Sequence, residues 1–127
     1  GDVYKRQETD HVNGDLTLGE NIGDLGGLTI AIRAYRKALA KQGLTLETAP
    51  DLGGITAVQR LIISFAQIWR SKARAETARM LLSIDPHSPA EFRCNGTVRN
   101  VDEFHEAFAV RPQDPMWLDP EKRVSIW

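Results

Sequence analysis

The stretch LTLGENIGDLGGLTIAIRAYRKALAKQG, residues 16–43, decides the fold. Its apolar residues recur at intervals of three and four, which is the period of one face of an α-helix. They are Leu18, Ile22, Leu25, Leu28, Ile32, Tyr35 and Leu39. We therefore predict an amphipathic helix from about Leu18 to Gln42, with Gly43 as its C-terminal stop.

Three glycines, Gly23, Gly26 and Gly27, lie inside this predicted helix. Each costs about 1 kcal/mol relative to alanine in a helix interior. That cost favours one of two arrangements. Either another backbone packs closely against this part of the helix, or the helix opens irregularly around Gly19.

Two more helices are predicted on the C-terminal side of this one. A loop over residues 45–54 leads to a buried helix from Thr56 to about Arg70, which has apolar residues on one broad face. A third helix is predicted from Arg74 to Ile84. Pro86 ends it, because the residue before a proline is pushed away from helical angles.

The last third of the chain contains shorter elements. Asp85–Pro89 is a turn-rich connection to a short helix or extended piece around Phe92, and Asn95-Gly96 predicts a turn. Asn100 is expected to cap a short helix from Val101 to Phe108.

The proline-rich tail contains two tryptophans, which predict a strap pinned to the body by aromatic anchors. The expected fold is mainly α, with long helices and an irregular proline-rich tail.

The composition excludes several classes of function. The 16 basic and 17 acidic residues nearly cancel, which argues against nucleic acid as the main partner. A single cysteine, Cys94, excludes a disulfide within the chain. No run approaches the ~18 apolar residues of a membrane span. Residues 1–10 are polar and patternless, and we interpret them as an unmatched leader or a sequence artefact.

Glu20 and Asp24 are the sharpest candidates for chemistry. They are four residues apart, so they lie on one helix face, a turn from each other. In a zinc site, one carboxylate could bind the metal and the other could accept the N–H of a zinc-bound histidine. The spacing alone also fits two acids stabilised by the dipole in the first turn of a helix.

A zinc peptidase site of this kind also needs His-Glu-x-x-His, with two ligands one turn apart and a glutamate base between them. The His-Glu pair of this chain is His105-Glu106, and Ala109 stands where the second histidine would be. A three-ligand site therefore cannot be assembled from this pattern within the chain.

His87 and Arg93 are further candidates. His87 lies between two prolines and could donate to the oxyanion of a tetrahedral intermediate. Arg93 could hold a substrate carbonyl with its fork of donors. Without further context, an exposed loop histidine and a surface ion pair are the commoner explanations. Cys94 is expected to be a small core or half-buried residue.

These residues, taken together, resemble the C-terminal region of the neprilysin and endothelin-converting-enzyme family of zinc endopeptidases, which includes bacterial oligopeptidases of the PepO type. The resemblance runs from His11 to the end of the chain. It is carried by His11-Val12-Asn13-Gly14, Thr17-Leu18-Gly19-Glu20-Asn21-Ile22, Asp24-Leu25-Gly26-Gly27, Ser64-Phe65-Ala66-Gln67 with Trp69, Asp85-Pro86-His87-Ser88-Pro89, Phe92-Arg93 with Asn95-Gly96, Phe104 with Ala107-Phe108, and Arg123-Val124 with Ile126-Trp127.

The resemblance implies a role for each candidate. Glu20 matches the third zinc ligand, and Asp24 matches the residue that contacts a zinc-bound histidine. His87 matches the histidine that stabilises the transition state, and Arg93 matches the arginine that holds a substrate backbone carbonyl. Gly23 stands where alanine is usual. The implied fold is the C-terminal portion of a thermolysin-like catalytic domain, over residues 11–127.

The expected function is therefore that of a fragment of a zinc metalloendopeptidase that cleaves oligopeptides. Its expected partners are peptide substrates and the missing N-terminal part of the same enzyme. The tail ends Ser125-Ile126-Trp127 without the cysteine that is typical of animal relatives, which favours a bacterial, exported protein. The rival hypotheses are a helical interaction module, such as one chain of a split enzyme, and a non-catalytic relative.

Overall fold

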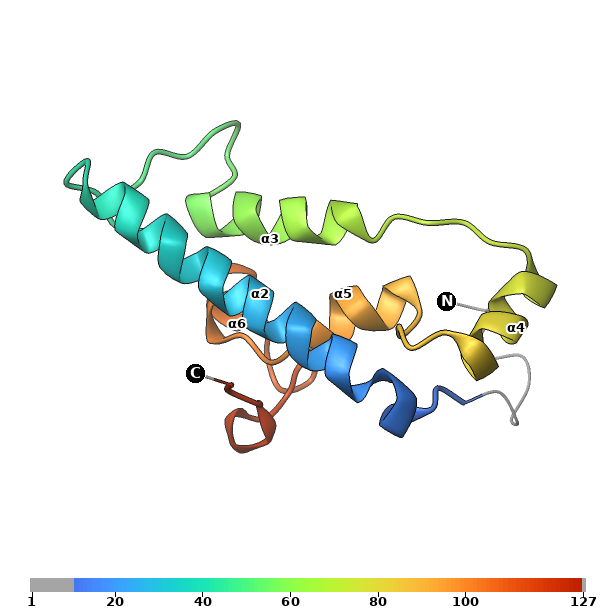
Figure 1. Ribbon diagram of the computed structural model, residues 1–127. Helices are drawn as coiled ribbons and strands as arrows, with labels where there is room; N and C mark the ends of the chain where they lie inside the picture. The colour runs from blue at the N-terminus through green and yellow to red at the C-terminus, as the bar shows by residue number, and fades with distance from the viewer. Residues whose placement is uncertain (1–10, 127) are drawn as a thin grey trace.

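The computed structural model describes residues 11–126, which form helices joined by loops (Figure 1). The α-helices are α2 (Gly14–Ala40), α3 (Ala57–Ile68), α4 (Ala75–Ile84), α5 (Ala90–Val98) and α6 (Asp102–Ala107), and a 3-10 turn follows at Pro120–Lys122. No strand is present between residues 11 and 126, where the extended pairing is one bridge between Leu52 and Ile55. The predicted mainly α fold is confirmed. Residues 1–10, with the predicted leader, and Trp127 lie outside the described part.

The longest helix, α2, begins earlier than its apolar pattern predicts. Asn13 is its N-cap, and the side-chain oxygen of Asn13 accepts hydrogen bonds from the backbone N–H groups of Asp15 (3.1 Å) and Leu16 (3.3 Å). The helix ends close to the predicted glycine stop, because Gly43 adopts a φ of 71°. A side-chain cap therefore fixed the start of the helix, which apolar periodicity could not locate.

Gly19, Gly23 and Gly27 do not have the consequences that the sequence suggested, whereas Gly26 is buried. The helix is continuous from Gly14 to Ala40 and does not open around Gly19. A Cβ atom built at Gly19, Gly23 or Gly27 meets no atom within 4 Å. In the described part of the chain, then, no backbone packs against these glycines, and the space in front of them is open.

The helix α3 is half-buried and not buried as predicted. A capping box starts it: Thr56 accepts from the backbone of Gln59, whose side chain accepts from the backbone of Thr56. Ile62 faces the core, whereas Ile68 is 70% exposed. The predicted broad apolar face is present, but the described residues cover only one side of it.

The predicted turn at Asn95-Gly96 is wrong, because α5 runs continuously from Ala90 to Val98. An Asn-Gly hairpin turn needs positive φ angles, and Gly96 has helical geometry here. Packing of α5 against α2 and α3 overrides the local turn preference.

Asn100 is not the cap of α6, which begins at Asp102 with Val101 as its N-cap. Its amide instead ties two other elements together. The Asn100 Nδ2 atom donates to the Gly96 carbonyl at 2.8 Å, and its Oδ1 accepts from the Val124 N–H at 2.7 Å. The side chain therefore joins the end of α5 to the C-terminal tail.

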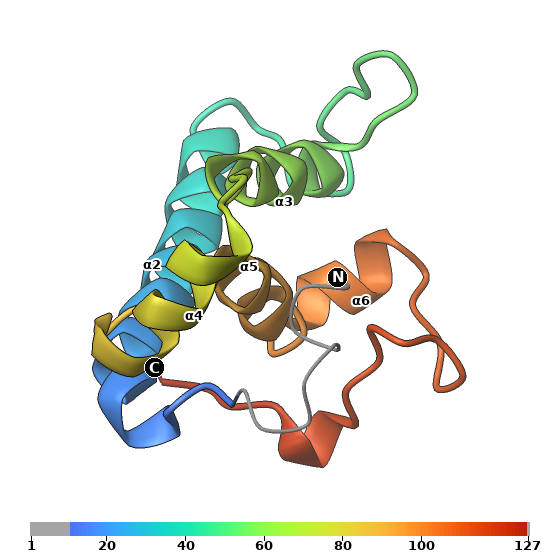
Figure 2. The same cartoon turned by 90° about the vertical axis from the view of Figure 1, so that its right-hand side faces the viewer.

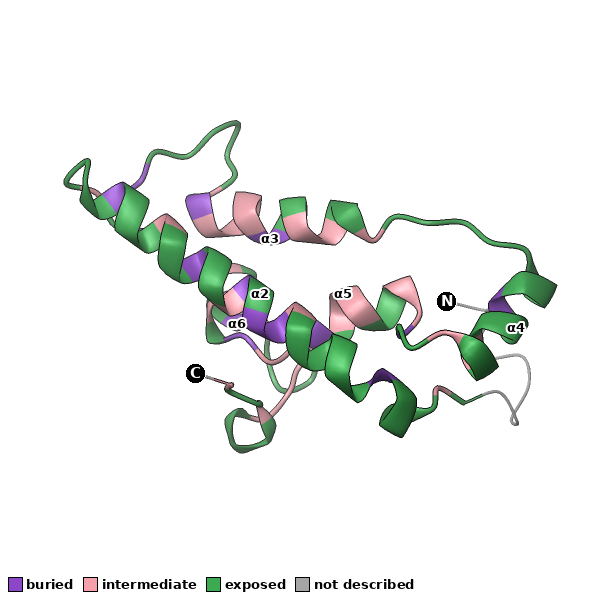
Figure 3. Ribbon diagram, viewed as in Figure 1, coloured by how far each residue is buried: buried purple, intermediate pink, exposed green. Residues whose placement is uncertain are grey.

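One hydrophobic core lies where α2, α3, α5 and α6 meet. Figure 2 shows α3 and α5 beside α2, and Figure 3 shows that the buried residues concentrate on the surfaces that these helices share. The core residues are Leu25, Leu28, Ile32, Leu39, Leu46, Ala49, Ala57, Ile62, Val98, Val101 and Phe104. The helix α4 is peripheral, with Ala78 as its buried residue.

The C-terminal tail is pinned by an aromatic anchor, as predicted. The Trp117 ring packs edge-on against the buried His105 ring, with 5.1 Å between centroids. The Arg123 guanidinium lies over Trp117 and pairs with Asp102 at 2.6 Å. Between residues 11 and 126, no helix is both long enough and apolar enough to cross a membrane.

Candidate functional site

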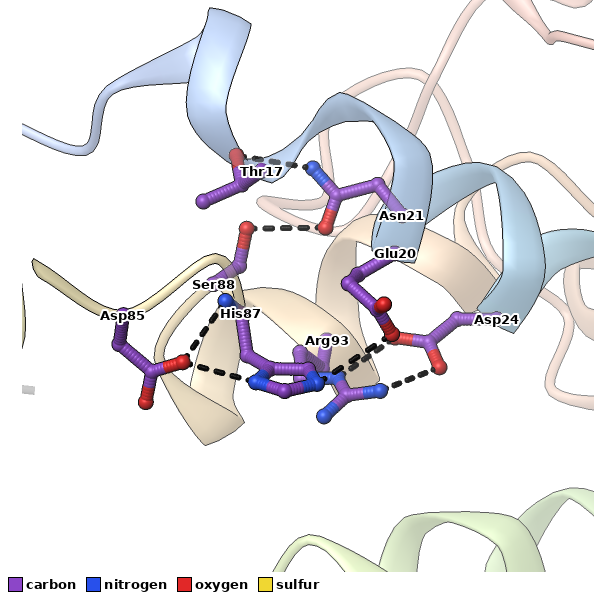
Figure 4. Close-up of polar contacts among 8 residues, drawn as sticks. All are labelled: Thr17, Glu20, Asn21, Asp24, Asp85, His87, Ser88 and Arg93. Carbon is purple, nitrogen blue, oxygen red and sulfur yellow. Dashed lines mark hydrogen bonds and ion pairs between the residues drawn. The ribbon is translucent and has the colours of Figure 1, made fainter.

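The candidate site lies where the first turns of α2 face the Asp85–Pro89 turn and the start of α5 (Figure 4). Glu20 and Asp24 project from α2 toward His87 and Arg93, which come from the turn and from α5. The fold thus brings together all four residues that the sequence singled out. They form two acid–base pairs.

The first pair is Glu20 with His87. The Nε2 atom of His87 lies 3.3 Å from the Glu20 Oε2 atom, and both side chains are almost half exposed, at 43% and 48%. On its other side, the His87 Nδ1 atom lies 2.7 Å from the Asp85 Oδ1 atom. A carboxylate only accepts hydrogen bonds, so Nδ1 carries a proton, and Nε2 donates to Glu20 only when it carries a second one. The contact with Asp85 directs Nε2 toward Glu20.

Asp85 also fixes the backbone of the turn. Its Oδ1 atom accepts a hydrogen bond from the His87 N–H at 2.9 Å. This backbone bond, followed by the bond from the His87 ring, lowers the pKa of Asp85 below its ordinary value. Asp85 therefore stays an anion and holds both the backbone and the ring of His87. The sequence reasoning gave Asp85 no role of its own.

A short chain of hydrogen bonds attaches this turn to α2. The Ser88 hydroxyl donates to the Asn21 Oδ1 atom at 2.9 Å, and the Asn21 Nδ2 atom donates to the Thr17 hydroxyl at 3.4 Å. Ser88 and Thr17 are buried. Sequence reasoning missed these residues as site supports. The sequence did contain a clue to their role, because these residues lie inside the same short motifs that contain Glu20 and His87.

The second pair is Asp24 with Arg93, and it is the stronger of the two. The Arg93 Nε and Nη2 atoms each donate to one Asp24 oxygen, both at 2.7 Å. The side chains are only 18% and 11% exposed. This two-bond contact with Asp24 raises the pKa of Arg93. In addition, the Arg93 guanidinium carbon lies 4.1 Å from the centre of the Trp69 ring.

The pairing of Asp24 with Arg93 adds a contact that the sequence did not predict. A carboxylate has about four lone-pair positions, and Arg93 occupies two of them. Asp24 can therefore hold Arg93 and still accept a hydrogen bond from a further donor. Its predicted contact with a metal-bound histidine stays a prediction.

Zinc does not fit the residues of this chain alone. A catalytic zinc site uses three protein ligands, and residues 11–126 contain no group of three or more His, Cys, Asp or Glu side chains that could hold a metal ion. Burial raises the pKa of the Cys94 thiol, so Cys94 is no ready thiolate ligand. The predicted role of Glu20 as a zinc ligand stays a prediction.

The fold is that of the zinc metallopeptidase class. The crystal structure of the zinc metalloprotease Zmp1 of Mycobacterium tuberculosis, solved in complex with an inhibitor, matches this chain with a TM-score of 0.90 and 52% sequence identity. The match covers 99% of this chain and 18% of that one. Within this class, the chain belongs to Peptidase family M13, whose family model matches residues 1–124.

Curated relatives agree with this assignment. Endothelin-converting enzyme 1 of Bos taurus is 44% identical over 116 residues, which cover 91% of this chain and 15% of that protein. Neprilysin-1 of Caenorhabditis elegans is 39% identical over 126 residues, 99% of this chain and 16% of that protein. The chain thus spans about one-sixth of the length of the relatives that it matches.

Proposed function

We propose that this chain is the C-terminal fragment of a zinc metalloendopeptidase that hydrolyses peptide bonds in oligopeptides, and that Glu20 supplies the third zinc ligand. One observation carries the proposal. Glu20 and Asp24 lie one turn apart on α2, and they contact His87 and Arg93 respectively. Membership of Peptidase family M13 supports the same reaction class.

Glu20 suits a ligand role because of where its carboxylate lies. The side chain is 48% exposed, and its pairing with His87 is long, at 3.3 Å. Exchange of such a half-exposed contact for a metal ion costs little. When bound, zinc polarises a carbonyl and lowers the pKa of a bound water molecule.

His87 would act on the substrate side of this site. Asp85 holds Nδ1, so Nε2 faces the Glu20 carboxylate that would bind the metal. With a proton on Nε2 as well as on Nδ1, His87 can donate a hydrogen bond to the oxyanion that forms when a peptide carbonyl is attacked.

Arg93 would bind a substrate backbone carbonyl. Its bonds to Asp24 use Nε and Nη2, which leaves the N–H groups of Nη1 to donate to a ligand. Asp24 would have two functions. It orients Arg93, and its remaining lone pairs can accept the N–H of a metal-bound histidine.

The rest of the site would come from a part of the enzyme that contains His-Glu-x-x-His. An apolar groove of about 330 Å³ runs between α2 and α3 and is lined by Gly23, Asp24, Gly27, Leu28, Ala31, Leu61, Ser64, Phe65 and Ile68. Because a Cβ at Gly27 would meet open space, another helix can approach α2 closely here. We assign this groove to the helix that bears the two histidines.

The test is reconstitution. The purified chain alone should show no zinc-dependent cleavage of a fluorogenic oligopeptide, because two metal ligands and the base are absent from it. Mixing it with a separately expressed chain that contains His-Glu-x-x-His should restore cleavage. The matched control is the same mixture with Glu20→Gln. Zinc-dependent cleavage by the chain alone, or full activity with Glu20→Gln, would contradict the proposal.

We also propose that the complete protein is bacterial and exported. The 52% identity to the mycobacterial structure exceeds the 44% identity to bovine endothelin-converting enzyme 1. Fractionation of a bacterium that expresses the complete gene should place the protein outside the cytoplasm, and recovery in the cytoplasm alone would contradict this.

A further inference from the structure

Trp69 is a residue of the site to which the proposed function gives no role. It is the C-cap residue of α3, so it belongs to neither of the elements that carry the four candidate residues. Its ring nevertheless lies under the Arg93 guanidinium, with 4.1 Å between the guanidinium carbon and the ring centre. This is a short cation–π distance, and the partner is the residue proposed to bind substrate.

Contacts of the aromatic ring hold Trp69 in place, and its N–H group does not contribute to them. The Nε1 atom is buried and has no hydrogen-bond partner among the residues that the structure describes. A buried N–H without a partner is unfavourable, so other contacts must hold the ring. They are Arg93 on its face and Phe65, one helical turn earlier, at 5.8 Å between centroids and 70° between planes.

Two independent contacts therefore fix the Arg93 guanidinium. Asp24 engages Nε and Nη2 in the plane of the group. Trp69 covers one face of that plane. An in-plane pair alone allows the guanidinium to tilt, because the side chain still rotates about its own bonds. The ring removes this freedom, so that the Nη1 edge points in one direction.

We propose that Trp69 is a positioning residue for Arg93, and that its stacking aims the free Nη1 edge at the substrate carbonyl. The kinetic consequence rests on the proposed function of Arg93, whereas the orientation of the guanidinium does not. Since the indole N–H takes no part in this contact, a phenyl ring should replace it and a leucine should not.

The first measurement uses the 127-residue chain and nuclear magnetic resonance of the arginine side chains. A proton above an aromatic ring resonates upfield, so the Arg93 Nε–H signal should move downfield in Trp69→Leu and only partly in Trp69→Phe. Trp117→Leu is the matched control, because Trp117 lies under Arg123 at 5.2 Å and not under Arg93. An Arg93 signal that does not move in folded Trp69→Leu, or that moves as far in Trp117→Leu, would overturn the proposal.

The second measurement uses the longest natural polypeptide that contains this chain. Trp69→Leu should lower kcat/KM for an oligopeptide roughly tenfold, and Trp69→Phe should restore most of it. In the background of Arg93→Leu, the Trp69→Leu change should cost nothing more. A full additional loss in that background would overturn the proposal. If Arg93→Leu alone leaves cleavage unchanged, the proposed function of Arg93 fails, and the resonance shift still decides the positioning.

Discussion

The two ends of this molecule differ in how many of their side chains make contacts within the described chain. At the end formed by α6 and the tail, Arg123 binds Asp102 and Trp117, and Trp117 donates to Asp119 at 2.9 Å. At the end formed by the first turns of α2, apolar side chains face solvent. Leu18 is 56% exposed and Ile22 is 45% exposed.

This difference separates a self-contained end from an end whose apolar residues the described chain leaves uncovered. Around Trp117 the tail closes the core with contacts from its own chain, so these residues act mainly on stability, whereas Val124 is exposed and lines a hollow with Leu18 and Ile22. The α2 end combines exposed apolar residues with the four candidate site residues. Exposed apolar surface of this kind marks an interaction site. Substitutions at the tail end should therefore mainly lower stability, and substitutions at the α2 end should mainly lower activity. The following experiments test this difference.

The largest expected effect is on stability, at the closed end. Phe104 is 9% exposed and packs against His105 and Phe108 at 5.3 Å and 5.5 Å between ring centroids. Phe104→Ala should lower the free energy of unfolding by about 3–5 kcal/mol, since it leaves a cavity.

Urea unfolding followed by circular dichroism would measure this loss. Leu18→Ala, at the open end, is the matched control and should change the free energy of unfolding by less than about 0.5 kcal/mol. If Phe104→Ala does not fold, Phe104→Leu should give a smaller, measurable loss. Equal effects at Phe104 and Leu18 would abolish the distinction between the two ends.

The next largest effect is on activity, at the open end. Glu20→Gln in the complete enzyme should lower kcat/KM by more than about 100-fold, because residues that merely orient metal ligands already account for about 10–100-fold. The stability of the isolated chain should change little, since the Glu20–His87 pair is half exposed. Peptide hydrolysis and thermal unfolding would be measured on the same variant. A large loss of stability with retained activity would contradict the assignment.

A smaller effect is expected at Gly27. A substitution there should raise the stability of the isolated chain and lower the activity of the complete enzyme. An added Cβ meets open space there, so Gly27→Ala should stabilise the isolated chain by about 0.5–1 kcal/mol. In the complete enzyme the same change should lower activity, because the methyl group would fill space proposed for a second helix.

Gly23→Ala is the matched control for this substitution. It has the same open surroundings in this chain, and alanine is the residue expected there from the family resemblance. It should stabilise the isolated chain equally and leave the activity of the complete enzyme unchanged. Unimpaired activity of Gly27→Ala would show that no helix occupies the groove at this point.

The smallest effect concerns the pH dependence of the tail. Hydrogen bonds from Lys122 and then from Trp117 lower the pKa of Asp119 below its ordinary value of 3.8. A lowered folded-state pKa stabilises the fold above the unfolded value, and this contribution is lost as the pH falls through the folded value. The fluorescence of Trp117 should therefore change below about pH 3.8, and Asp119→Asn should remove that change. A pH profile that is identical in Asp119→Asn would contradict this assignment.

Local patterns identified most of the helices, because the periodicity of the apolar residues reports which face is buried. These patterns failed where a contact with a distant part of the chain outweighs the local preference. Asn95-Gly96 predicts a turn, but packing of α5 on α2 keeps it helical. Asn100 has the character of a helix cap, but the tail is a stronger partner for its side chain.

The candidate site could be predicted only in part for the same reason. The spacing of Glu20 and Asp24 placed them on one helix face, and the family resemblance selected His87 and Arg93. No spacing could show that Asp24 holds Arg93, because 69 residues separate them. Trp69 contacts Arg93 from a third element, and its contact was equally invisible in the sequence.

The sequence by itself determined the mainly helical fold, the family and the identity of the four candidate site residues, because periodicity and short motifs are local properties. Only the tertiary structure decided which acid pairs with which base, what supports His87 and Arg93, and which face of α2 is left open. These are contacts between distant segments. They depend on how the helices pack around the core, which no single stretch of the chain encodes.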